Sequence, residues 1–92
     1  MSFMGYADHG PHVAQALATR EEIKWHKEAA PGPRCRALRW TCRCRAPRYF
    51  LFTGGGRLFI GRQDARGWFE TTRLPHQQAE ELWMRLLTGE AR

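Results

Sequence analysis

Three cysteines and one histidine are the residues of this chain best suited to binding a metal ion. Cys35, Cys42 and Cys44 share one short stretch, and His26 precedes it. Thiolates and imidazoles are the ligands that Zn²⁺ prefers, so these four residues could form a Cys3His site. Strong zinc motifs, however, are paired Cys-x2-Cys knuckles, and the spacing of Cys42 and Cys44 differs from them. We therefore expect no cofactor and cysteines that pack as small apolar residues, with zinc as the alternative.

Arginines surround these cysteines. The stretch RCRALRWTCRCR, residues 34–45, contains five arginines and no acidic residue. Residues 29–63 contain eight arginines and no acid, whereas the rest of the chain has seven basic and nine acidic residues, so this segment supplies the whole net charge of +6. A GC-rich genome would favour arginine over lysine, but it would not remove the acids. Localised positive charge is typical of a protein that binds an anionic partner.

The same stretch alternates in the manner of a half-buried strand. Leu38, Trp40, Cys42 and Cys44 would share the inner face, and the basic residues the outer face. A sheet of two or three strands fits the major groove of B-DNA, where arginine contacts phosphates and guanine. The pattern thus predicts a nucleic-acid partner, duplex DNA first. The predicted contact residues are Arg39, Thr41, Arg43, Arg45, Arg48, Arg57 and Arg62.

Two other interpretations of the basic face stay open. It could be a solvated edge kept soluble by its charge. It could also dock on an acidic protein, which would make the chain a protein-interaction module or an inhibitor. Catalysis has little support, because Glu70 is the one carboxylate on the predicted strands and no nucleophile–base spacing is present. We expect a protein that is not an enzyme.

The second half of the chain gives clear element signals. Tyr49–Thr53, Arg57–Gly61 and Trp68–Thr72 are predicted strands, joined by turns at Gly54–Gly56 and Gln63–Gly67. Pro75 suits the first turn of a helix, and Gly89 its C-terminal cap. Between them, five apolar residues repeat at helical spacing on one face. These residues are Ala79, Leu82, Trp83, Leu86 and Leu87.

The first half is less decisive. Residues 1–11 are expected to be irregular and flexible, and His12–Leu17 to form a short helix. Thr19-Arg20-Glu21-Glu22 matches a capping box, which predicts a helix from Arg20 to Ala29. The alternation of Ile23, Trp25 and Lys27 would suit a strand instead; we favour the helix.

These elements predict one α+β domain spanning residues 1–92. An antiparallel meander of three or four strands, residues 34–73, would be backed by an amphipathic helix, residues 75–89, and preceded by the short helical segment. The opposite sheet face would be open and basic. The predicted core comprises Trp40, Phe50, Phe52, Leu82, Trp83 and Leu86.

Two resemblances bear on function. The order of three strands followed by a helix resembles the arm-type DNA-binding domain of tyrosine recombinases, which implies a stand-alone accessory or regulatory factor of the kind that serves phages or plasmids. Leu58–Arg62 resembles the RNP2 strand of RRM domains, although no RNP1 strand follows it. With no apolar run that could span a membrane and no signal-peptide pattern at Met1–Gly5, we expect a cytoplasmic protein and no membrane partner.

Overall fold

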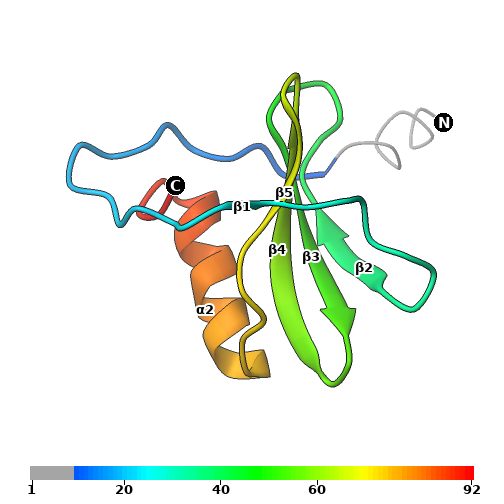
Figure 1. Cartoon of the computed structure of the whole chain (residues 1–92). Helices are drawn as coiled ribbons and strands as arrows, with labels where there is room; N and C mark the ends of the chain where they lie inside the picture. Colours follow the sequence, from blue (N-terminus) through cyan, green and yellow to red (C-terminus); the bar gives the residue numbers. More distant parts are fainter. Residues whose placement is uncertain (1–9) are drawn as a thin grey trace, which may run out of the picture.

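A five-stranded antiparallel sheet and one C-terminal helix make up the fold in the computed structural model, which describes residues 10–92 (Figure 1). The α+β prediction with a C-terminal helix is therefore confirmed. No helix in the described part of the chain is long and apolar enough to cross a membrane. The elements are β1 (His26–Lys27), β2 (Arg36–Trp40), β3 (Arg48–Gly54), β4 (Arg57–Asp64), β5 (Gly67–Glu70) and α2 (His76–Leu87).

The strand order across the sheet is β1-β5-β4-β3-β2, and every pair is antiparallel. Strands β2 to β5 follow one another as a meander, as the sequence predicted, and β1 extends the far edge. The β3–β4 turn uses Gly55 and Gly56, whose φ angles of 63° and 78° lie in the left-handed region that glycine tolerates. Strand β2 forms the opposite edge, so its outer backbone groups face away from the sheet.

The N-terminal half differs from the prediction: the sheet has five strands rather than three or four, and no helix forms between residues 10 and 35. Glu21 bridges Ala91, and β1 pairs with β5. This extended path lets Ile23 and Trp25 pack against the core. Burial of these two side chains thus outweighs the capping-box signal. Residues 1–9, most of the segment predicted to be flexible, lie outside the described residues.

Helix α2 covers one face of the sheet, drawn to the left of the strands in Figure 1. Its buried stripe comprises Ala79, Leu82, Trp83 and Leu86, as the helical spacing predicted. The stripe packs on Tyr49 and Leu51 of β3 and on Leu58 and Ile60 of β4, which forms the main core. Gly89, with φ of 85°, follows the helix end where the sequence placed the cap.

The opposite face of the sheet is aromatic, not basic. Four rings gather on it, with centroid separations of 5.4 to 5.9 Å. The connection 28–35 must cross the sheet, because β1 and β2 lie at opposite edges, and Figure 1 shows it on the side away from α2. This arrangement corrects the expected open, basic face. The rings are those of Phe50, Phe52, Phe59 and Trp68.

The predicted core is right for the helix and partly wrong for the sheet. Leu82, Trp83 and Leu86 are buried, whereas Phe50 and Phe52 are half-buried on the aromatic face. Trp40, predicted to lie inside, is 43% exposed at the end of the edge strand. The reason is that β2 has a neighbour on one side only and ends at this residue.

Candidate nucleic-acid interface

A bulge in β2 reverses the face of Arg39. Ala37 lies opposite Phe52, but Arg39, two residues later, lies opposite Leu51, so Leu38 is an extra residue in the ladder. Since one extra residue moves every later side chain to the other face, Arg39 lies on the side of α2. There its guanidinium pairs with the carboxylate of Glu80. The prediction that Arg39 belongs to an open outer face is therefore wrong.

Thr41 does not project outward either. It is 3% exposed, and its Oγ1 accepts a hydrogen bond from the backbone N–H of Tyr49 at 2.9 Å. The backbone N–H of Thr41 in turn donates to the Tyr49 carbonyl at 2.9 Å. Thr41 thus closes the ladder where β2 ends, one residue after Trp40. The predicted strand does not continue to residue 45, and Thr41 has a structural role.

Arg43 and Arg45 lie in the β2–β3 turn that follows, and both are exposed. Their side chains do not alternate along a strand as predicted, because the chain has left the sheet. The turn is held at its two ends by Thr41 and by the start of β3. The structure thus presents these two guanidinium groups to solvent at one end of the β2 edge.

The remaining predicted contact residues lie in three different settings. Arg48 lies over the Phe50 ring at 4.8 Å, on the aromatic face, and Arg57 is exposed at the β3–β4 turn. Arg62 is half-buried on the other face, 4.4 Å from the centroid of Phe69, and it pairs with Asp64 at 3.2 Å. Arg62 therefore stabilises the fold, and the structure does not bring the seven predicted residues together.

Arg34 and Arg36 are two arginines of the acid-free segment that were not among the predicted contact residues. Arg36 begins β2 and Arg34 precedes it by two residues, and both are exposed. The acid-free segment 29–63 includes both, but the alternating pattern that predicted the contact residues begins at Ala37. We call Arg34, Arg36, Arg43 and Arg45 the arginine edge, because they flank the two ends of the edge strand β2. Within residues 10–92, none of the four makes an ion pair.

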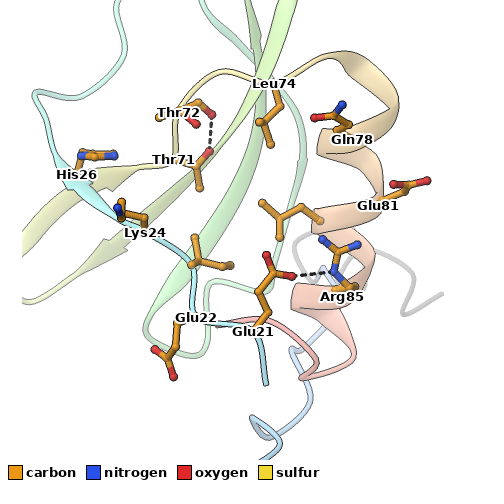
Figure 2. Close-up of a pocket in the computed structure, with 12 residues that line it drawn as sticks. Glu21, Glu22, Lys24, His26, Thr71, Thr72, Leu74, Gln78, Glu81 and Arg85 are labelled. Carbon is orange, nitrogen blue, oxygen red and sulfur yellow. Dashed lines mark hydrogen bonds and ion pairs between the residues drawn. The ribbon is translucent and has the colours of Figure 1, made fainter. Parts of the chain in front are cut away.

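Three glutamates line a pocket to which β2 contributes no residue. This pocket between residues 21–26, residues 71–74 and α2 is lined by Glu21, Glu22 and Glu81 (Figure 2). Figure 2 shows Glu21 directed toward Arg85, and the carboxylate and guanidinium are 3.1 Å apart. These three glutamates therefore do not neutralise the arginine edge, although Glu80 pairs with Arg39 of β2.

The structure also separates the four residues of the alternative Cys3His site. His26 lies at the pocket of Figure 2, which no cysteine lines, and Cys35 lies near Gly54 and Arg73. The described residues thus do not bring the alternative Cys3His set together. Cys42 and Cys44 do lie together, with their sulfur atoms 3.0 Å apart. This contact with Cys42 raises the pKa of the Cys44 thiol, which disfavours the thiolate that a nucleophile needs.

An apolar groove runs beside the arginine edge, between β2 and α2. Leu38 and Trp40 line it from the strand, and Met84 and Leu87 from the helix. Leu38 is 38% exposed and Met84 54% exposed, so large apolar side chains border the groove on both sides. A protein partner could bury this surface, whereas nucleic-acid backbone would gain little from it.

Comparison of the chain with protein-family models, with curated proteins and with solved structures gave no match. The resemblances to recombinase arm domains and to RRM strands thus gain no support from these comparisons.

Proposed function

We propose that this protein binds nucleic acid, duplex DNA first, through contacts between the arginine edge and backbone phosphates. One observation carries the proposal: four exposed arginines, without an acidic partner in the described residues, flank an edge strand of the sheet. Such a chain would act as an accessory or regulatory factor. Guanidinium groups bind phosphate through paired hydrogen bonds and keep their charge at every physiological pH.

The spacing of the arginine edge suits a phosphate backbone. Arg36 and Trp40 bound β2, and because Leu38 is bulged the strand advances three ladder steps, about 10 Å at about 3.3 Å per step. The arginines at the two ends of the strand are thus far enough apart to contact different phosphates of one duplex. Contacts of this kind position a protein on the duplex but specify little sequence.

Fluorescence anisotropy of a labelled random duplex at several salt concentrations tests the proposal. Each neutralised phosphate contributes about −0.9 to the slope of log affinity against log salt, so four contacts predict a slope of about −3.6. Arg43→Glu with Arg45→Glu should weaken binding and reduce the slope. Single-stranded DNA and RNA of equal length serve as competitors, and either competing better than the duplex would contradict the duplex preference.

A matched control separates local contact from net charge. Lys24→Glu with Arg66→Glu makes the same change in charge, but at exposed positions near the β1 edge. We expect this control to weaken binding much less than the variant of the β2–β3 turn. Equal loss in the two variants would mean that the protein binds by total charge alone. No binding at low salt would contradict the proposal.

The second candidate is a protein-interaction module that docks on an acidic protein. The observation that favours it is the apolar groove, where exposed Trp40 lies beside Arg39. Aromatic and arginine side chains are frequent binding hot spots. A complex that survives high salt, is lost in Trp40→Ala and is retained in the arginine variants would support docking. Loss in the arginine variants alone, with steep salt dependence, would favour nucleic acid.

A further inference from the structure

His12, Cys42 and Cys44 bring three metal-ligating atoms into one cluster. The Nε2 atom of His12 lies 3.2 Å from the Cys44 Sγ, and the two sulfur atoms are 3.0 Å apart. All three atoms lie within 4.8 Å of one another. His12 and Cys44 are exposed, and Cys42 is buried at the base of the cluster. Sequence spacing did not indicate this set, because His12 is 32 residues from Cys44.

The fold holds the two halves of the cluster together by backbone contacts. The Cys42 N–H donates to the Pro11 carbonyl at 3.0 Å, immediately before His12. Gly10 approaches the backbone of Trp40 so closely that a Cβ at Gly10 would lie 2.5 Å from the Trp40 carbonyl oxygen. Residues 10–12 therefore run beside residues 40–42. Placement of the histidine next to the thiols follows from this packing.

We propose that His12 Nε2, Cys42 Sγ and Cys44 Sγ bind one Zn²⁺ ion, with water or an external ligand in the fourth position. Tetrahedral Zn²⁺ has zinc–sulfur bonds of about 2.3 Å and zinc–nitrogen bonds of about 2.0 Å. In this geometry two bound sulfur atoms are about 3.8 Å apart, and a bound sulfur and nitrogen are about 3.5 Å apart. Small rotations of the exposed His12 and Cys44 side chains supply this expansion. The two thiols lose their protons to solvent when the ion binds.

Local charge and hydrogen bonding suit a zinc–thiolate site. Two thiolates neutralise the divalent ion, so binding adds no net charge beside Arg43 and Arg45. The Cys44 N–H lies 3.5 Å from the Cys42 Sγ, where it would stabilise a bound thiolate. A disulfide is the weaker interpretation, because cysteines two residues apart are poorly placed for disulfide geometry.

The ion would fasten residues 10–12 to the β2–β3 turn. That turn carries two residues of the arginine edge, so zinc would order it in the free protein. The metal site does not depend on the proposed function, since its ligands and its test are separate from DNA binding.

Metal titration of the reduced full-length chain tests the site. We expect one equivalent of Zn²⁺ to bind and Co²⁺ to give the intense absorption of a thiolate complex. Cys44→Ser and His12→Ala should each weaken Zn²⁺ binding by more than about tenfold, the lower limit for loss of an outer-shell partner alone. Both residues are exposed, so the variants should fold, and circular dichroism checks this.

Cys35→Ser and His26→Ala are the matched controls, because they remove a thiol and an imidazole that lie outside the cluster. Both should bind Zn²⁺ as the unaltered chain does. Zn²⁺ should also raise the melting temperature of the unaltered chain and of the controls, but not of Cys44→Ser. Absence of stoichiometric binding at micromolar Zn²⁺, or an equal loss of affinity in Cys35→Ser, would overturn the proposal.

Discussion

Thr41 and Tyr49 are joined by two hydrogen bonds, one of which uses a side chain in place of a backbone carbonyl. The Thr41 N–H donates to the Tyr49 carbonyl, and the Tyr49 N–H donates to Thr41 Oγ1, both at 2.9 Å. Thr71 and Ile60 repeat this arrangement at the end of β5. The Thr71 N–H donates to the Ile60 carbonyl at 2.9 Å, and the Ile60 N–H donates to Thr71 Oγ1 at 3.1 Å. At both places the chain leaves the sheet, and the hydroxyl satisfies a buried N–H that would otherwise lose its partner.

Thr41→Val should therefore destabilise the fold without altering the arginine edge. Valine keeps the shape but leaves the buried Tyr49 N–H without an acceptor, at a cost of about 1–3 kcal/mol. For a domain of this size, each kcal/mol lowers the melting temperature by about 4–8 °C. Thermal unfolding measures the effect. Thr72→Val is the control, because Thr72 is exposed, and its melting temperature should stay close to that of the unaltered chain.

DNA binding supplies the second readout for Thr41. Because its side chain is buried, Thr41→Val should bind the duplex as tightly as the unaltered chain at a temperature where both are folded. A loss of affinity in the folded variant would restore the sequence-based prediction that Thr41 contacts nucleic acid.

Arg39 should matter less for DNA binding than Arg43, although the sequence ranks them together. Its guanidinium is already paired with Glu80, and removal of an exposed ion pair costs at most about 1 kcal/mol of stability. Arg39→Ala should therefore reduce affinity less than Arg43→Ala. Glu80→Gln releases Arg39 and removes a negative charge, so affinity should rise. Anisotropy with the same duplex measures all three variants, and an Arg39→Ala effect larger than that of Arg43→Ala would contradict this assignment.

The sequence predicted the parts of the fold that depend on regular periods. The stripe from Ala79 to Leu86 identified α2, and Gly55 and Gly56 the β3–β4 turn, because each signal is local. The face of Arg39 was not predictable in this way. It depends on a bulge at Leu38, and a single inserted residue leaves the composition unchanged while exchanging the two faces.

The N-terminal half was mispredicted because its conformation is set by distant partners. Glu21 pairs with Ala91, and Trp25 donates its indole N–H to the Arg92 carbonyl at 2.9 Å. A local capping box competes poorly with contacts of such long range. The same explanation covers the proposed metal site, where His12 and Cys44 meet because residues 10–12 pack beside the end of β2.

Gly61 should not tolerate a side chain, because the Trp68 ring lies on its backbone. A Cβ at Gly61 would lie 2.2 Å from the ring, and Trp68 is fixed by a 2.7 Å hydrogen bond to Glu70. Gly61→Ala should cost about 1–3 kcal/mol of unfolding free energy, the usual cost of overpacking. Urea unfolding measures it. Gly32→Ala is the control, since nothing lies within 4 Å of its added Cβ.

A double variant identifies the cause of the Gly61 effect. Trp68→Leu removes the ring that the new Cβ would meet, so the two changes together should cost less than the sum of their separate costs. Strict additivity would mean that the strain at Gly61 arises from a different neighbour.

Tyr49 should make stability depend on pH in the alkaline range. Burial raises the pKa of its hydroxyl above the ordinary value of about 10. The folded state therefore retains a proton that the unfolded state has lost, so the stabilising contribution is complete below pH 10 and is lost as the pH rises above it. The loss cannot exceed about 1.4 kcal/mol per pH unit for one proton.

Tyr49→Phe is the variant that tests this, because phenylalanine cannot ionise. It keeps the ring beside Trp25, whose ring centroid lies 5.9 Å from that of Tyr49. Urea unfolding from pH 8 to pH 11 should show a smaller decline for Tyr49→Phe than for the unaltered chain. All other ionisable groups are common to the two proteins and cancel in the comparison, so equal declines would show that Tyr49 does not govern the alkaline limit.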